Sequence, residues 1–378
     1  MVIVGGNPHN DNDYYQSVSK FTSGTSNVTR NAEQKAFSTG KLNFQVDPSE
    51  MGVIRLSKAY FVLDEETGLW KLEYGIPMPI ETRLDTTGSM GNNVDIALEA
   101  LPRQYNLCSS VLPEFALQLA TGIFGDCDDR FVLCRPKFAH SAERLVERLT
   151  LMVPEKQGWG NGGEDPHYGL FGAAYLTDAR IDKYGLKGYD FTVSDEPARS
   201  DFRKDQLIRI FGPDVFEKVA ENGFKIDKND IPSTQEVVQD LLKRAHAFFI
   251  QINYDSNTTV FWKCMFGSDR VVSLHDIKYL PHLQALIVGL TEGNLTMSTA
   301  SDFLTENGAS QPTAERIVRS VAHIPMGAQA ILRAKLDKPL PKKGDLFNEK
   351  TDIWPVELTD IPPKKKAPTK KKDKIEWL

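Results

Sequence analysis

The sequence predicts an α/β protein in which helices cover both faces of a doubly wound, six-stranded, mostly parallel sheet. Strand-like and helix-like segments alternate beyond residue 76, which is the pattern that crossover units between parallel strands produce. The composition agrees, because 378 residues with 40% hydrophobic and 25% charged residues fall in the globular range. Two alternating apolar runs joined by "DEETG" also predict an N-terminal hairpin extension.

Each element is predicted from its own apolar pattern. The predicted strands are 80–84, 116–124, 130–134, 189–194, 247–252 and 270–274. The predicted helices lie between them, at 92–101, 140–151, 168–184, 201–221, 234–245, 257–266 and 279–292. Glu81 and Arg83 fall on one face of the first strand, where a central strand normally carries apolar residues. We therefore expect them to pair with charged neighbours or to lie beneath the hairpin.

Shifts in composition divide the chain into five segments. The first residues are rich in Asn, Ser, Thr and Gly, and the last are rich in Pro and Lys, so both ends are predicted to be flexible. The predicted segments are a flexible arm (1–45), a β-hairpin extension (50–75), the α/β domain (76–293), a small helical appendix (294–338) and a disordered tail (339–378).

Charge and cysteine usage predict a cytoplasmic protein. The net charge is −6, and the segment from Lys364 onward carries +5, which leaves −11 for the rest and argues against specific nucleic-acid binding. The four cysteines form no CxxC pair, so we expect free thiols in a reducing compartment. The N-terminus has no basic region of a signal peptide, and no apolar run approaches the ~18 residues of a membrane helix.

Three oxygen-bearing side chains follow the first predicted strand. In "DTTGSMG", Asp85, Thr87 and Ser89 occupy alternate positions, and Gly88 and Gly91 allow a sharp turn into the next helix. A carboxylate and two hydroxyls at the carboxyl end of a strand suit a hard cation, above all Mg²⁺. Ser and Thr are also common helix N-caps. Taken alone, the motif leaves open whether Asp85 holds a metal or acts as a nucleophile.

Two further segments place carboxylates at the same edge of the predicted sheet. The sequence "GGED" puts Glu164 and Asp165 immediately before a helix, and "TVSDEP" ends a strand in Asp195 before a proline turn. The carboxyl ends of parallel strands meet at one edge, so the three loops are expected to converge. Their convergence favours a metal site over three separate helix caps.

These motifs resemble the von Willebrand factor A (VWA) domain and its metal-ion-dependent adhesion site (MIDAS), in an intracellular bacterial or phage form. The resemblance covers about 76–293 and includes "HAFFIQINYDSNTTVFWKCMFGSDRVVSLHDIKYLPHL", which is similar to the end of the family's sheet and its final helix. It implies a Rossmann-like sheet and Mg²⁺, with Ca²⁺ or Mn²⁺ as alternatives. It implies that the ion leaves one position open for a partner's carboxylate. The implied ligands are Asp85, Thr87, Ser89, Asp165 and Asp195.

Asp165 departs from many members of the family, which have Thr at this position. An additional carboxylate makes the ion less electrophilic, so we expect tighter metal retention and weaker capture of an acidic partner than in a Thr version. We expect His167 on the surface or beside the site. Asp126 follows the second predicted strand, from which it could reach the rim of the site, but we expect a structural role instead.

A phosphatase is the alternative enzyme interpretation of the first loop. D-x-T-G-S is also similar to the nucleophile loop of haloacid-dehalogenase-like phosphatases, with Asp85 as nucleophile. However, Asp126 of "GDCDD" follows by only 41 residues, no Lys-ending strand lies between them, and "GGED" and "SDEP" have no role in that scheme. The chain also contains no GxxxxGK[ST] loop. We therefore expect no catalytic activity.

The sequence predicts a metal-dependent protein-binding module. The resemblance implies an adaptor or assembly factor, with an AAA+ ATPase as an expected partner. The alternative is a structural component of a large phage or bacterial assembly, in which the arm and the tail thread onto neighbours. The Lys-rich tail ends in Trp377–Leu378, and we expect this tip to dock on a partner. We expect no membrane binding and no specific nucleic-acid binding.

Overall fold

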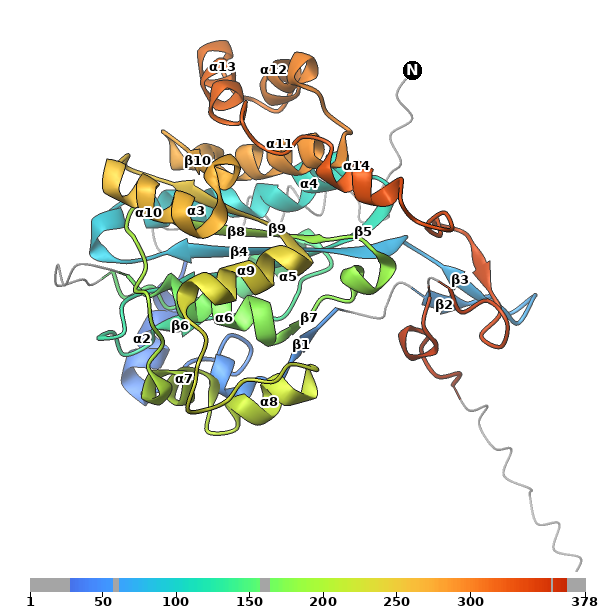
Figure 1. The fold of residues 1–378 in the computed structure, drawn as a ribbon, viewed down its shortest axis with the longest axis horizontal. Helices are drawn as coiled ribbons and strands as arrows, with labels where there is room; N and C mark the ends of the chain where they lie inside the picture. Colours follow the sequence, from blue (N-terminus) through green and yellow to red (C-terminus); the bar gives the residue numbers. More distant parts are fainter. Residues whose placement is uncertain (1–27, 57–60, 157–163, 355, 366–378) are drawn as a thin grey trace, which may run out of the picture.

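A six-stranded sheet forms the centre of the computed structural model, which describes residues 28–56, 61–156, 164–354 and 356–365 (Figure 1). The strand order is β10-β9-β8-β4-β5-β6, and neighbours are parallel except for β5 and β6. The strands are β4 (Ile76–Asp85), β5 (Phe115–Phe124), β6 (Leu133–Cys134), β8 (Gly188–Ser194), β9 (Ala245–Gln251) and β10 (Val271–Ser273). The predicted α/β class and six-stranded, mostly parallel sheet are confirmed.

Helices cover both faces because the inner strands bury side chains on both sides. Phe248 packs into the core on one face and its neighbour Phe249 into the core on the other, as the two-residue period of a strand requires. The first core is covered by α3 (Asn93–Ala100), α4 (Gln104–Val111), α5 (Ala142–Leu149) and α11 (Leu280–Glu292). The second is covered by α6 (Pro166–Tyr175), α7 (Lys204–Phe211), α8 (Val215–Glu221), α9 (Thr234–Arg244) and α10 (Ser256–Phe266).

Three helical segments differ from the predicted ones. The helix expected over 201–221 is two helices, because Gly212 at φ 91° and the following Pro213 end α7. The helix expected over 168–184 ends at Tyr175, and the chain continues into β7 (Thr177–Asp178) and a 3₁₀ turn, η4 (Ile181–Tyr184). Helix α4 was not predicted, because several polar residues interrupt its apolar pattern.

Glu81 and Arg83 lie in a buried charge network beneath α6. The Arg83 guanidinium donates to both oxygens of Asp190, at 2.8 Å for Nη1 to Oδ2, and Arg135 Nε donates to Glu81 Oε1 at 3.1 Å. Gly169 of α6 makes room for Arg83, since a Cβ there would stand 2.4 Å from Arg83 Cδ. The two arginines pair with the two carboxylates, and these partners come from neighbouring segments of the sheet. The charges are therefore neutralised by one another and not covered by the hairpin.

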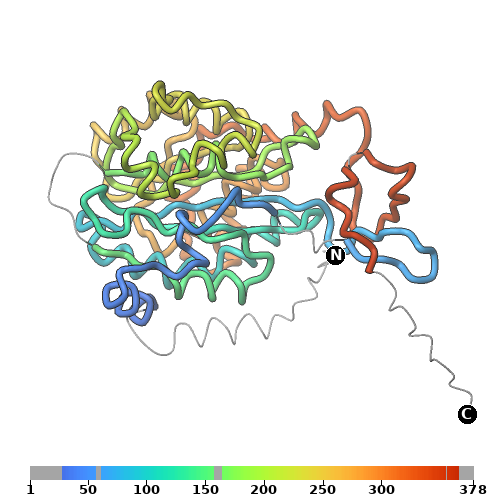
Figure 2. Tube along the Cα trace, turned by 90° about the horizontal axis from the view of Figure 1, so that it is seen from below, coloured from blue at the N-terminus to red at the C-terminus, as the bar shows by residue number. Residues whose placement is uncertain are grey.

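The chain also builds a smaller sheet beyond the main one. Strands β2 (Phe61–Leu63) and β3 (Trp70–Leu72) form an antiparallel hairpin, and β11 (Leu346–Phe347) pairs with β3. Figure 2 shows this hairpin beside the C-terminal segment, at one end of the molecule. The remaining short strand, β1 (Ile54–Arg55), pairs with β7. The helical appendix consists of α12 (Met297–Glu306), α13 (Gln311–Ser320) and α14 (Ala328–Arg333).

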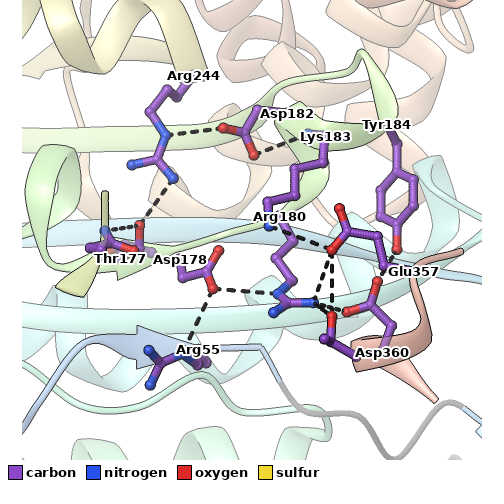
Figure 3. Close-up of polar contacts among 12 residues, drawn as sticks. Arg55, Thr177, Asp178, Arg180, Asp182, Lys183, Tyr184, Arg244, Glu357 and Asp360 are labelled. Atoms are coloured by element: carbon purple, nitrogen blue, oxygen red, sulfur yellow. Dashed lines mark hydrogen bonds and ion pairs between the residues drawn. The ribbon is translucent and has the colours of Figure 1, made fainter. Parts of the chain in front are cut away.

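The part of the predicted disordered tail that the structure describes is folded. Phe347, Val356 and Ile361 are buried, and Asp360 contacts Arg180 and Tyr184 (Figure 3). These apolar residues are too widely spaced among Pro and Lys to form a periodic pattern. The predicted flexible arm likewise contains α2 (Arg30–Thr39) and the buried Val46. Residues 1–27 and 366–378, including Trp377–Leu378, lie outside the described residues. Among the residues described, no helix is long and apolar enough to cross a bilayer.

Candidate metal site

The first loop begins where β4 ends, between its two neighbours β5 and β8. Asp85 Oδ1 accepts hydrogen bonds from the Thr87 backbone N–H (2.8 Å) and hydroxyl (2.7 Å), and Asp85 Oδ2 accepts one from the Ser194 hydroxyl (2.5 Å). The Thr87 and Ser89 hydroxyl oxygens lie 3.1 Å apart. Thr86 anchors the loop, because its N–H and hydroxyl both donate to a carbonyl of β5. The predicted trio is therefore gathered at one point.

The third loop joins the first through Asp195, directly after β8. Asp195 Oδ1 accepts a hydrogen bond from Ser89 Oγ at 2.8 Å, and its backbone carbonyl accepts one from the Thr258 hydroxyl at 3.1 Å. Asn253 Nδ2 donates to the other carboxylate oxygen at 3.3 Å. Asn253 has φ 49°, a left-handed conformation that Asn tolerates better than most residues. The structure thus brings Asp85, Thr87, Ser89 and Asp195 together in one hydrogen-bonded chain.

The second loop presents its two carboxylates to different neighbours. Asp165 Oδ2 accepts a hydrogen bond from the Cys127 N–H at 2.5 Å, and its Oδ1 lies 3.5 Å from Arg199 Nε. Glu164 lies against the first loop, where the Thr87 hydroxyl and the Asp85 charge both act on its carboxyl group. Glu164 Oε2 and Asp165 Oδ1 are both buried without a hydrogen-bond partner among the described residues. The electrostatic interaction with Asp85 and Thr87 makes Glu164 a second candidate ligand beside Asp165.

A second group of potential ligands surrounds Asp165. One donor atom each from Asp126, Cys127 and Asp165 lie within 4.8 Å of one another. The Arg199 guanidinium reaches all three, at 3.3 Å from Cys127 Sγ and 3.4 Å from Asp126 Oδ1. Burial, with the adjacent Asp165 charge, raises the pKa of Cys127 to about 12, so the sulfur is a neutral thiol. The Arg199 guanidinium therefore already supplies positive charge to this second group of potential ligands.

His167 lies beside the second loop, with Nδ1 3.6 Å from Asp165 Oδ1, and not on the surface, so the second of its two expected places is the one observed. It is fully buried on α6, with its ring against Tyr168 and Phe202. Burial and the nearby Arg199 lower the pKa of His167 to about 3, so the imidazole is neutral. The aromatic neighbours explain the burial, since α6 is buried along its whole length.

The electrostatics and the donor atoms of the site suit a divalent cation. Burial raises the pKa of Asp85 to about 7, against the opposing hydrogen bonds from Ser194 and Thr87. Burial also raises the pKa of Glu164 to about 9, and the charges of Asp85, Glu196 and Asp126 add to the rise. Carboxylate and hydroxyl oxygens are the ligands of Mg²⁺ and Ca²⁺. The orphaned Glu164 oxygen and this all-oxygen donor set therefore suit a hard divalent ion.

Two residues that shape the site, Ser194 and Asn253, were not singled out from the sequence. Ser194 and Asn253 both follow apolar strand runs, at positions where a polar residue faces the sheet edge. Glu164 was recognised as part of "GGED", but the sequence does not distinguish which of two adjacent carboxylates turns toward the trio. The two residues differ in their contacts, since Asp165 accepts a hydrogen bond from the Cys127 N–H and lies beside Arg199.

No protein-family model and no curated protein sequence matches the chain. Among solved structures, it is similar to proximal thread matrix protein 1 from the mussel byssus (TM-score 0.37, 10% identity, 57% of this chain and 48% of that chain). Another structure of that protein has a zinc-occupied MIDAS motif (TM-score 0.37, 11% identity, 57% and 48%). The pilus adhesin SpaC from Lactobacillus rhamnosus GG has a TM-score of 0.38 at 12% identity (59% and 31%). The chain spans less than half the length of each, and similarity at this level does not place it in a family.

Proposed function

We propose that this protein is a metal-dependent protein-binding module. Its Mg²⁺ would be held by Asp85, Thr87, Ser89 and Asp195 together with one carboxylate of the second loop. The observation that carries the proposal is the hydrogen-bonded chain between the first and third loops, with a buried oxygen on each second-loop carboxylate that has no hydrogen-bond partner among the described residues. A bound divalent ion supplies an electrophilic position for a partner's carboxylate.

Glu164 is the second-loop residue that we infer for the ion. Its carboxyl group interacts electrostatically with Asp85 and Thr87, whereas Asp165 accepts a hydrogen bond from Cys127 and lies 3.5 Å from Arg199. Asp165 is the second-loop ligand predicted from the sequence, and its assignment as a ligand stays a prediction. The matched pair Glu164→Gln and Asp165→Asn separates the two residues. We expect Mg²⁺ affinity, measured by isothermal titration calorimetry, to fall at least tenfold in the first variant and less in the second. The reverse order would assign the ion to Asp165.

We also propose that the protein binds a partner and does not transfer phosphoryl groups. Asp85 is fully buried and both its oxygens accept hydrogen bonds, which supports a ligand-holding residue over an exposed nucleophile. The adaptor role beside an AAA+ ATPase, and a place in a large assembly as its alternative, are proposals carried by the sequence motifs. A cytoplasmic location is proposed on the same footing, and the free Cys108, Cys127, Cys134 and Cys264 are compatible with it.

The test is a pull-down in which the metal is the only variable. The tagged protein is incubated with lysate in Mg²⁺ or in chelator, and the captured proteins are quantified by mass spectrometry. We expect a set of partners that is lost in chelator and also lost in Ser89→Ala. The matched control is Ser298→Ala, which removes an exposed hydroxyl of the helical appendix. An identical partner list in all four samples would contradict the proposed function.

A further inference from the structure

Two adjoining hollows lie between the β10 edge of the main sheet and α13 of the helical appendix. Their volumes are about 720 and 510 Å³, and they share Tyr254, Ser273 and Ser320. We call them together the edge groove. Strand β10 is its floor, since this strand is the outermost of the sheet. In Figure 1, α12 and α13 lie beyond α11, on the side of the molecule where β10 and α10 are found.

One end of the edge groove reaches the candidate metal site. Asn253 lines the larger hollow, and its Nδ2 donates to Asp195 Oδ2 at 3.3 Å. The next residue, Tyr254, lines both hollows and is 73% exposed. A partner with a carboxylate at the metal would therefore meet this groove within one or two residues along its chain.

The two sides of the groove are fixed to each other. His323, which follows α13, makes a 2.9 Å hydrogen bond through Nε2 with the Val271 carbonyl of β10. Ile317 of α13 lines the larger hollow and is 4% exposed, so the helix is packed on the core and not free to swing. The groove is thus a preformed surface, which lowers the ordering cost of binding.

The lining of the groove carries positive charge that the protein does not neutralise. Lys263, Arg316 and Arg319 are exposed, and within the described part of the chain none has a carboxylate oxygen within 4.0 Å. By contrast, Asp276 of the same lining is paired with Lys278 at 3.1 Å. The lining thus holds three cationic side chains against two acidic ones, Asp269 and Asp276, which leaves it with a net positive charge. This charge points to an anionic ligand.

We propose that the edge groove binds an extended acidic segment of the protein partner whose carboxylate reaches the metal site. The inference rests on the proposed function, because it assigns the rest of that partner's contact surface. Lys263 and Arg319 lie in one hollow and Arg316 in the other, so the positive charges are spaced along the groove. Asp269 and Asp276 in the lining disfavour a nucleic acid, which carries a charge on every residue, and suit a peptide in which acidic and neutral residues alternate.

The experiment uses a fluorescein-labelled peptide of alternating Glu and Gly as the probe, with fluorescence anisotropy in Mg²⁺ as the readout. We expect the full-length protein to bind this peptide, and a peptide of alternating Lys and Gly to fail. The variant Arg316→Glu/Arg319→Glu is expected to weaken binding by at least about tenfold. The matched control is Lys137→Glu/Lys204→Glu, which reverses two exposed charges on other elements and is expected to leave affinity unchanged.

A Mg²⁺ titration by calorimetry on the same proteins separates the inference from the proposed function. We expect Arg316→Glu/Arg319→Glu to bind Mg²⁺ as the unmodified protein does. If the unmodified protein binds no Mg²⁺ but the groove variant still loses the acidic peptide, the proposed function fails and the groove assignment stands. Equal peptide affinity in the groove variant and the control, or no binding to the unmodified protein, would overturn the inference. Tighter binding of single-stranded oligothymidine than of the peptide would also overturn it.

Discussion

Replacing Asp85 by Asn should stabilise the metal-free protein and abolish its response to Mg²⁺. Asp85 is fully buried, and its pKa is about 7 against an ordinary value of 3.8. The folded state therefore binds this proton more tightly than the unfolded chain does. The resulting stability is fully present below pH 3.8 and is lost as the pH rises through about 7. At pH 8 the metal-free wild-type protein bears the whole cost of a buried, ionised carboxylate.

The magnitude follows from the two pKa values. At 1.36 kcal/mol per pH unit, their difference corresponds to about 4 kcal/mol of unfolding free energy at pH 8. The amide accepts fewer hydrogen bonds than the carboxylate from Thr87 and Ser194, which offsets about 1 kcal/mol of that gain. We expect a net stabilisation of about 3 kcal/mol, or a rise of about 4 °C in the unfolding midpoint.

Differential scanning fluorimetry at pH 5 and pH 8, each in chelator and in excess Mg²⁺, measures this effect. In chelator, we expect the variant to unfold at a higher temperature than wild type at pH 8 and at nearly the same temperature at pH 5. In Mg²⁺, only wild type should gain stability, by about 2.7 kcal/mol at a hundredfold excess over the dissociation constant. Asp302→Asn, an exposed change on α12, is the control. Equal midpoints at pH 8 in chelator would refute the electrostatic reasoning.

Three further changes test the fold and the second loop. Arg83→Met leaves Asp190 buried without its cation and should lower the free energy of unfolding by about 3–5 kcal/mol, measured by urea denaturation. A loss below about 1 kcal/mol would show that Arg83 and Asp190 are not energetically coupled. Asp360→Ala removes the contacts to Arg180 and Tyr184, so limited proteolysis should cut the segment 339–365 faster than in wild type. An unchanged cleavage rate would mean that other contacts hold this segment in place. Asp165→Thr should weaken Mg²⁺ retention as the sequence predicts, and equal affinities by calorimetry would reject that expectation.

Much of the sheet could be predicted because its strands carry the signal themselves. The predicted strands 116–124 and 189–194 lie within one residue of β5 and β8, since apolar runs bounded by turns define both ends. The folded segment 339–365 could not be predicted in this way. Its order depends on single apolar residues such as Val356 and on Asp360, whose partners lie about 180 positions earlier in the chain. Long-range pairing of this kind leaves no local pattern.

The candidate site shows the same limit at the scale of single residues. Alternate spacing and a glycine turn indicate that Asp85, Thr87 and Ser89 share one point, and the structure places them there. The sequence cannot say whether Glu164 or Asp165 turns toward them, because adjacent residues of an irregular loop have no fixed alternation. The N–H of Cys127 and the guanidinium of Arg199 hold Asp165, and both come from distant segments.

The most direct test of the central claim is a calorimetric Mg²⁺ titration of the full-length protein and of Ser89→Ala. Ser89 links the first loop to Asp195, and its replacement removes one hydroxyl without changing a charge. We expect one Mg²⁺ per wild-type chain and an affinity at least tenfold lower in the variant. Equal affinities, or no Mg²⁺ binding by wild type, would contradict a metal site at this edge of the sheet.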